Sequence, residues 1–248
     1  MTAKKAATMK GKETTSSTFD ETRENVHRQI LSTVSHDLKT PLATVIGSLE
    51  VYLRMEDKLS HEKKITLIKS ALGEAYRLDS FVTNILDMAK LESGMVKIKN
   101  ERSDLTTLLQ DCVTRIGPRA ERGSITLQPP TATTIVHTDP MLLGKAAGIL
   151  LDNALKHAGN QPIIRLEYGV EDDRGYIRVV DNGAGVVPVK MEAIFSKYTR
   201  FSKSDQQNAG TGLGLAICQQ IMSLLSGSVN VMNCPEGGAV FTLTFPCK

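Results

Sequence analysis

The segment LSTVSHDLKTPLATVIGSLEVYL, residues 31–53, decides the architecture of the first part of the chain. At about 100° per residue, its recurrent apolar residues fall within one stripe of roughly 100°. They are Leu31, Val34, Leu38, Leu42, Val45, Leu49 and Leu53. His36 lies about 150° from the centre of that stripe, and Thr40 lies beside it one turn later. The pattern predicts an amphipathic helix that buries its apolar stripe and exposes His36.

A second helical stretch runs from about His61 to Leu91 after a short polar connection, and its apolar residues follow a heptad pattern. The two stretches predict an antiparallel helical hairpin over residues 19–94. Because one hairpin leaves apolar surface uncovered, we expect a homodimer in which two hairpins close a four-helix bundle. Pro41 removes a backbone donor beside His36, so we also expect a kink or a loosened turn there.

The remainder of the chain divides into segments of different composition. Residues 1–18 contain almost no apolar side chains to bury, so we expect a flexible tail. We expect a hinge over residues 95–103, which follow Gly94. Residues 104–248 predict an α+β domain, with β-rich runs at 124–127, 163–170, 176–180, 228–232 and 240–245. Residues 171–175 read as the loop of a hairpin. Asp139-Pro140 is typical of a helix start, and that helix should run through His157.

Composition excludes several functional classes. Apolar residues make up 41% and charged residues 23%, as in soluble globular proteins. A net charge of +3 and 4% aromatic residues argue against nucleic acid as a partner. No secretory signal or membrane span is evident. The four cysteines are scattered, which predicts buried free thiols in a reducing cytosol.

Two glycine-rich segments are candidates for ligand binding. Asp181-Asn182-Gly183-Ala184-Gly185 places a carboxylate at the end of a strand, where it suits the exocyclic amine of adenine; a plain Asn-Gly turn is the alternative. Gly210-Thr211-Gly212-Leu213-Gly214-Leu215 opens a helix that runs to about Leu225, so its amide groups favour a phosphate. The spacing matches neither a P-loop nor a dinucleotide-binding fingerprint.

Polar residues on the helix that ends at His157 add a possible metal and phosphate site. Asn153 and His157 are one turn apart, with Lys156 on nearly the same side. An asparagine oxygen can bind Mg²⁺ and a lysine can meet phosphate; an ordinary polar outer face is the alternative. Residues 186–209, with Lys197, Arg200 and Lys203, read as a lid over a charged ligand. For His36 itself, a solvated or capping surface residue is the alternative.

Taken in order, these segments resemble the motifs of the sensor histidine kinases of two-component signalling, from about residue 25 to 247. SHDLKTPL (35–42) resembles the phospho-acceptor box of that family, and LDNALKH (151–157) its asparagine box. DNGAG (181–185) resembles the first glycine box and GTGLGL (210–215) the second. IFSKYTRF (194–201) resembles the phenylalanine box.

The resemblance implies a fold and a reaction. The fold is a dimerisation and phosphotransfer hairpin followed by an α/β sandwich that binds ATP, of the type shared with DNA gyrase and MutL. His36 would attack the γ-phosphate of ATP while Asp37 takes up the ring proton. Asn153 would hold Mg²⁺, with help from Lys156 and Arg200. The phosphoryl group would pass to an aspartate of a response regulator, and Thr40 would orient water when that regulator is dephosphorylated.

The nucleotide-binding residues implied by the resemblance are Asn153, Lys156, His157, Asp181, Gly183, Gly185, Lys197, Arg200, Gly210, Thr211, Gly212, Leu213, Gly214 and Leu215. One position departs from the family pattern: Ile149 stands where a second asparagine is common, which would lower nucleotide affinity or turnover.

Two alternatives to a histidine kinase stay open. One is a non-catalytic dimeric scaffold that binds nucleotide or relays phosphoryl groups, in which Ile149 marks a degenerate site. The other is a gyrase-like ATPase that hydrolyses ATP within the nucleotide domain. We expect a cytoplasmic protein, or the cytoplasmic part of a receptor that reaches the membrane only through a further sensor region or a partner.

Overall fold

The computed structural model describes residues 34–35, 37–55, 57–116, 124–128, 130, 134–159, 161–199 and 212–247. The chain divides into two compact units, Met1–Val82 and Thr83–Lys248. This division falls within one continuous helix, α2 (His61–Glu92). The tail predicted at residues 1–18 lies outside the described residues, and the domain limits predicted at 94 and 104 stay predictions.

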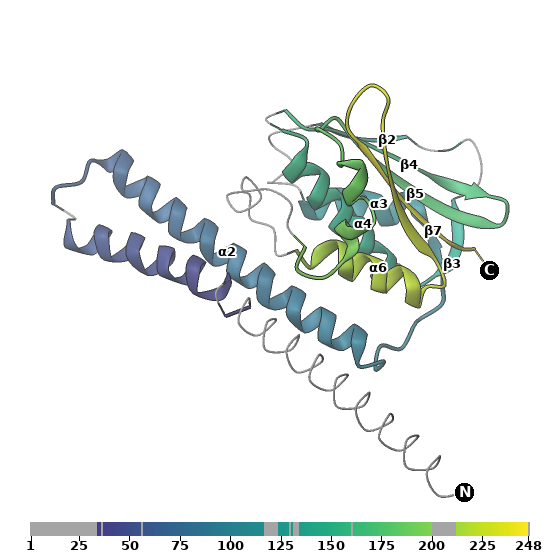
Figure 1. Cartoon of the computed structure of the whole chain (residues 1–248), viewed down its shortest axis with the longest axis horizontal. Coiled ribbons are helices and arrows are strands. Elements are labelled where there is room, and N and C mark those ends of the chain that lie inside the picture. The colour runs from purple at the N-terminus through teal and green to yellow at the C-terminus, as the bar shows by residue number, and fades with distance from the viewer. Residues whose placement is uncertain are drawn as a thin grey trace, which may run out of the picture. The chain divides into compact units, whose positions relative to one another are not determined.

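The first unit contains a helical hairpin, drawn at the purple and blue end of Figure 1. Residues 37–54 are helical, and α2 follows after a short turn. The helix runs through Pro41 without interruption, so the loosened turn predicted there does not break it. A proline removes only one backbone donor, and the neighbouring turns can hold the helix.

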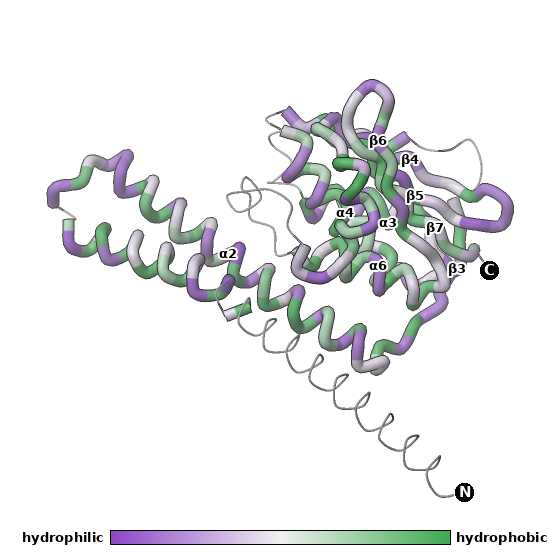
Figure 2. Tube along the Cα trace, viewed as in Figure 1, coloured by the Kyte–Doolittle hydropathy of each residue, from purple (hydrophilic) through white to green (hydrophobic). Residues whose placement is uncertain are grey.

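Hydrophobic and hydrophilic residues are interspersed along both helices of this hairpin, as the colours of the Cα trace show (Figure 2). Ala71 and Phe81 are buried. Many larger apolar side chains remain exposed in the single chain: Leu42, Ile46, Leu49, Leu53, Ile65, Ile68, Leu72 and Tyr76. The hairpin therefore covers only part of its own apolar surface, as the sequence pattern led us to expect.

The second unit is built on a five-stranded sheet with the strand order β2-β4-β5-β7-β6. Its strands are β2 (Ser124–Gln128), β4 (Ile163–Glu171), β5 (Arg174–Asp181), β6 (Ser228–Asn233) and β7 (Ala239–Pro246). Strand β2 pairs parallel to β4, and the other neighbours pair antiparallel. All five strands coincide with the predicted β-rich runs to within two residues at each end.

Three helices cover one face of this sheet: α3 (Leu105–Ile116), α4 (Pro140–His157) and α6 (Gly214–Leu224) (Figure 1). Alternate strand residues and the inner faces of α4 and α6 form a core from which water is excluded. Its fully buried side chains include Leu143, Leu150, Leu151, Ile164, Leu166, Tyr168, Ile177, Ile217, Leu243 and Phe245. Burial of this apolar surface contributes about 25 cal/mol per Å² to the free energy of folding and is the main contribution that stabilises the two layers.

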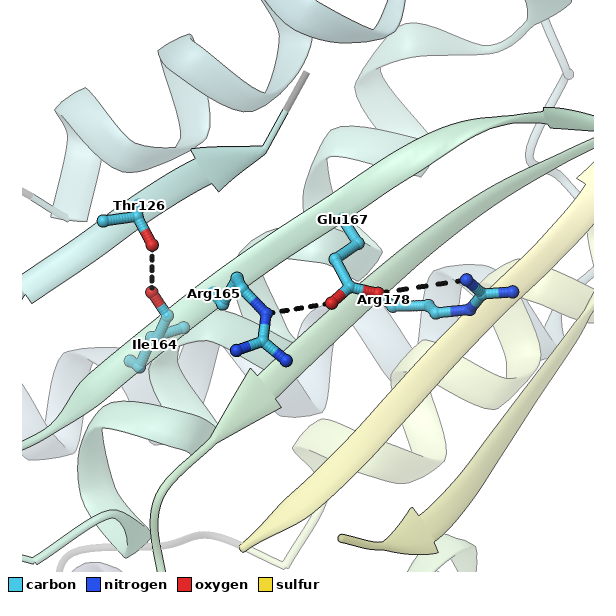
Figure 3. A network of polar contacts seen from close by, with 5 residues as sticks. All are labelled: Thr126, Ile164, Arg165, Glu167 and Arg178. Carbon is cyan, nitrogen blue, oxygen red and sulfur yellow. Dashed lines mark hydrogen bonds and ion pairs between the residues drawn. The ribbon is translucent and has the colours of Figure 1, made fainter. Parts of the chain in front are cut away.

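The opposite face of the sheet is polar. Arg165 Nε donates to Glu167 Oε1 at 2.9 Å, and Arg178 Nη1 lies 3.9 Å from Glu167 Oε2 (Figure 3). At the edge, Thr126 Oγ1 donates to the carbonyl oxygen of Ile164 at 3.4 Å. The alternation of apolar and polar residues along the strands therefore separates a helix-covered face from a charged one.

Two features of the second unit differ from the sequence-based expectation. Strands β1 (Glu101–Asp104) and β3 (Ile135–Thr138) form a separate antiparallel pair that was not predicted. The loop expected over residues 171–175 is a two-residue turn, Asp172–Asp173, with φ of 50° and 61°. Aspartate tolerates this left-handed conformation, so the strands extend further toward the turn than expected.

All four cysteines are free, as predicted. Cys112 and Cys218 are buried, whereas Cys234 and Cys247 are half-buried. Burial raises the pKa of Cys218 to about 12 and also raises the pKa of Cys112. Among the residues that the structure describes, every helix is too short or too polar to span a bilayer.

Candidate functional site

Helix α4 is fixed at its start by Asp139, which is only 4% exposed. Asp139 Oδ1 accepts hydrogen bonds from the backbone N–H of Met141 and Leu142, each at 3.0 Å, and Pro140 occupies the first turn. The other oxygen, Oδ2, accepts a bond from the backbone N–H of Lys99 at 2.8 Å. The predicted N-cap is confirmed, and the same carboxylate also holds the segment that enters the unit from α2.

The first glycine segment follows β5 and lies against the end of α4. Asp181 is 7% exposed, and its Oδ1 accepts from the backbone N–H of Gly183 at 2.8 Å and of Ala239 at 3.2 Å. A Cβ atom on Gly183 would lie 2.6 Å from the carbonyl oxygen of His157. Only a glycine therefore allows this backbone to approach α4 so closely.

Asn182 fixes the other side of the same segment. Its Oδ1 accepts from Ile163 N at 2.9 Å, and its Nδ2 donates to Gln161 O at 3.2 Å. These bonds tie the segment to the start of β4. These bonds and those of Asp181 fix the turn at the edge of the core and hold the carboxylate of Asp181 in place.

The second glycine segment leads into α6. Gly210 and Thr211 lie outside the described residues, and the helix begins at Gly214. Leu213, just before it, is fully buried, and Leu215 lies in the first turn. A Cβ on Gly214 would lie 3.4 Å from Ile149 Cγ2, so the start of α6 packs against α4. The unpaired amides at such a helix start favour an anion.

Asn153 lies on α4 between the contact points of the two glycine segments. Ile149, beside the start of α6, is one turn before Asn153, and His157, beside the first glycine segment, is one turn after it. Asn153 is half-buried, and the neighbouring Lys156 pairs with Asp152 at 2.5 Å. The structure therefore brings Gly183 and Gly214 against the helix that carries Asn153, although the sequence separates these elements widely.

The segment that resembles the phenylalanine box starts from η3 (Ala193–Phe195) and is anchored by buried Phe195. Lys197 forms an ion pair with Glu92, which belongs to the same compact unit. Tyr198 adopts a φ of +61°, and its backbone N–H donates to the carbonyl oxygen of Gly212 at 2.9 Å. Burial raises the pKa of Tyr198. Arg200 lies outside the described residues.

The predicted phospho-acceptor residues belong to the other unit. His36 lies outside the described residues, while Asp37 and Thr40 are helical. Asp37 is half-buried and Thr40 is exposed. The predicted site residues therefore fall into two groups, the hairpin group and the group around α4.

Sequence reasoning missed two residues that contact the first glycine segment. Asn233, at the end of β6, bonds to the backbone of Val186, and Gly238 lies against the backbone of Asp181. A single asparagine at the end of a strand has no distinctive spacing. The adjacent glycines at 237 and 238 were the only sequence signal that another backbone passes close by.

Comparison with known proteins is consistent with both groups. Residues 26–94 match the family model described as His Kinase A (phospho-acceptor) domain, and residues 138–248 match Histidine kinase-, DNA gyrase B-, and HSP90-like ATPase. The sensor protein KdpD of Escherichia coli (strain K12) is 34% identical over 226 residues, which are 90% of this chain and 25% of that protein. The chain thus spans about a quarter of that relative.

Two solved structures share the architecture. The full-length ShkA in complex with AMPPNP is 26% identical, with a TM-score of 0.61 over 88% of this chain and 45% of that one. The histidine kinase ThkA in complex with the response regulator protein TrrA is 19% identical, with a TM-score of 0.69 over 93% of this chain and 66% of that one. The latter similarity concerns the fold alone.

A phospho-acceptor hairpin followed by an ATPase-type α/β sandwich is the domain pair of a protein histidine kinase, and the predicted fold class is confirmed. The chain belongs to the sensor histidine kinases of two-component systems.

Proposed function

We propose that the second unit binds ATP where α4 meets the two glycine segments. The observation that supports this most is the position of Asn153 on α4, one turn from Ile149 and one turn from His157, which contact the two segments. Asp181 can accept a hydrogen bond from the adenine amine, because its two described bonds both use Oδ1. The start of α6 would then receive the phosphates. The AMPPNP bound by the similar ShkA agrees with this assignment.

The donor set suits Mg²⁺ held jointly by protein and nucleotide. Mg²⁺ prefers oxygen ligands and often takes only one or two from the protein, so the amide oxygen of Asn153 is sufficient with phosphate oxygens and water. When bound, the ion would neutralise charge on the phosphates. Lys156 and Arg200 would support the phosphates, and Ile149, which has no polar atom in its side chain, would lower nucleotide affinity or turnover.

We place the chemical step at His36. An imidazole nitrogen of His36 attacks the γ-phosphorus of ATP, an N–P bond forms, and the bond to the β,γ-bridging oxygen breaks as ADP leaves. The proton on the other ring nitrogen passes to Asp37, its neighbour in the chain. A histidine next to a carboxylate in the sequence provides both the nucleophile and the base that this step needs.

The phosphoryl group would then pass to an aspartate in the receiver domain of a response regulator. The ThkA–TrrA complex supports this class of partner. Thr40 is exposed on the hairpin, where its hydroxyl could orient water for the reverse, phosphatase reaction. The exposed apolar side chains of the hairpin, such as Leu49 and Leu72, support a homodimer. Both ATP and such regulators are cytoplasmic, and we place the activity there.

Labelling with γ-³²P-ATP tests this function directly. The wild type should acquire label that is labile to acid and stable to base, and His36→Ala should acquire none. His61→Ala, which removes an exposed histidine at the start of α2, is the matched control and should label normally. Absence of label from the wild type under every condition would support the scaffold alternative. Release of phosphate that persists in His36→Ala would support the gyrase-like ATPase.

A further inference from the structure

Asn233 binds the backbone of Val186, the residue that follows the first glycine segment, through both ends of its side-chain amide. The backbone N–H of Val186 donates to Asn233 Oδ1 at 2.7 Å, and Asn233 Nδ2 donates to the carbonyl oxygen of Val186 at 2.7 Å. Both bonds have good lengths for their type. Asn233 is the last residue of the edge strand β6, and its side-chain amide pairs with Val186 as the peptide group of a neighbouring strand would.

The fit around Gly185 shows how closely Asn233 approaches this segment. Gly185 has a φ of +72°, and a Cβ there would lie 2.8 Å from Asn233 Oδ1 and 3.2 Å from the carbonyl oxygen of Gly238. A larger residue would be strained and would push the amide away. Asn233 and Gly185 therefore form one contact in which the side chain fills the space that the glycine leaves.

The turn between β6 and β7 holds the other end of the segment as well. A Cβ on Gly238 would lie 1.9 Å from the carbonyl oxygen of Asp181, so the two backbones are in direct contact. The backbone N–H of Ala239 donates to Asp181 Oδ1. The segment from Asp181 to Val186 is consequently fixed at its start by residues 238–239 and at its end by Asn233.

We infer that Asn233 is a positioning residue for the nucleotide: it holds the glycine segment in the shape that presents Asp181 to adenine. This inference rests on the proposed ATP site. Asn233 is exposed, so its two bonds add little to the stability of the core. Without them the segment would have to be ordered when the nucleotide binds, and that ordering would weaken affinity.

The test compares Asn233→Ala with Asn230→Ala in the chain of residues 1–248. Asn230 is an exposed asparagine on the same strand, paired in register with Thr242 and distant from the glycine segment along the strand, which makes it a matched control. We measure the dissociation constant of ADP by calorimetry, the maximal rate of autophosphorylation at saturating ATP, and the melting temperature. Asn233→Ala should weaken ADP binding about tenfold, a loss of about 1.4 kcal/mol, and leave the maximal rate within about twofold and the melting temperature near that of the control.

Hydrogen exchange gives an independent readout of the same mechanism. Peptides that cover residues 183–187 should exchange faster in Asn233→Ala without nucleotide, and saturating ADP should restore the wild-type rate. An ADP affinity equal to that of Asn230→Ala would overturn the inference. So would a maximal rate and melting temperature that fall together with the affinity, because that result would indicate a general structural role.

Asp181→Ala separates this outcome from failure of the proposed function. If the wild type binds ADP, Asp181→Ala does not, and Asn233→Ala binds as the wild type does, the ATP site stands and the role of Asn233 is wrong. If the wild type fails to bind ADP at all, the proposed ATP site itself is wrong, and the inference about Asn233 is lost with it.

Discussion

Replacing Asp139 should separate two tasks that one carboxylate performs. Oδ1 caps α4 through the amides of Met141 and Leu142, while Oδ2 accepts from the amide of Lys99. Asp139→Ala removes both contacts. Asp139→Asn can keep the cap, because its amide oxygen still accepts, but its NH₂ group then faces the N–H of Lys99 and cannot accept from it.

The expected magnitudes follow from these contacts. Losing an N-cap costs about 1 kcal/mol, and losing a hydrogen bond to a charged group costs about 1.5–3 kcal/mol. Asp139→Ala should therefore lower the free energy of unfolding by about 2.5–4 kcal/mol, and Asp139→Asn, which loses only the bond from Lys99, by about 1.5–3 kcal/mol. For a domain of 150–250 residues, 1 kcal/mol changes the melting temperature by about 2–4 °C. We expect a decrease of about 5–16 °C in the melting temperature of the alanine variant.

Calorimetric melting of the chain of residues 1–248, combined with hydrogen exchange, is the appropriate assay. In Asp139→Asn, peptides covering residues 95–104 should exchange faster while the first turn of α4 stays protected; in Asp139→Ala both should exchange faster. Asp111→Ala, at an exposed position of α3, is the control and should change stability by no more than about 0.5 kcal/mol. Melting of Asp139→Ala within 1 °C of the wild type would refute the reasoning.

Three further predictions concern the second unit. Ser226 has a φ of +54°, so Ser226→Gly should stabilise the protein by about 0.5–1 kcal/mol in urea unfolding, whereas Ser223→Gly within α6 should destabilise it. A hydrogen bond from Thr134 lowers the pKa of Asp104 in the folded state. The ionised Asp104 therefore stabilises the fold above the pKa of an unfolded aspartate, about 3.9, and this stabilisation is lost as the pH falls through the lower pKa of the folded state. Asp104→Asn should reduce the loss of melting temperature on acidification to pH 3, and an unchanged acid profile would contradict this. Burial raises the pKa of Cys218 to about 12 and also that of Cys112, so a thiol reagent at pH 8 should modify at most two cysteines before unfolding and all four after it.

The parts of the fold that the sequence predicts well are those specified by local chemistry. Helix α4 is an example, because Asp139 and Pro140 mark its start and Gly159 follows its end. The strands of the large sheet were also predictable, since β-branched and aromatic residues recur along them. The phospho-acceptor and glycine segments stood out because each combines polar or glycine residues in an unusual spacing.

The parts that escaped prediction depend on contacts between distant segments. Strand β1 has the sequence Glu-Arg-Ser-Asp, which has no apolar residue and forms a strand only by pairing with β3. The bonds of Asn233 and the close approach of Gly238 to Asp181 likewise arise only once β6 and β7 have folded against β5. Such contacts have no local sequence signal, so periodicity and spacing cannot reveal them.

The contacts of Cys247 have a practical consequence for protein engineering. Its carbonyl oxygen accepts from the backbone N–H of His137 in β3, and its own N–H donates to the carbonyl oxygen of Asp173. Cys247 therefore connects strand β3 of the two-stranded sheet to the β4–β5 turn of the five-stranded sheet. Strand β3 in turn leads directly into Asp139. An affinity tag should therefore be placed so that Cys247 keeps both hydrogen bonds, because its removal would loosen β3 and disturb the beginning of α4.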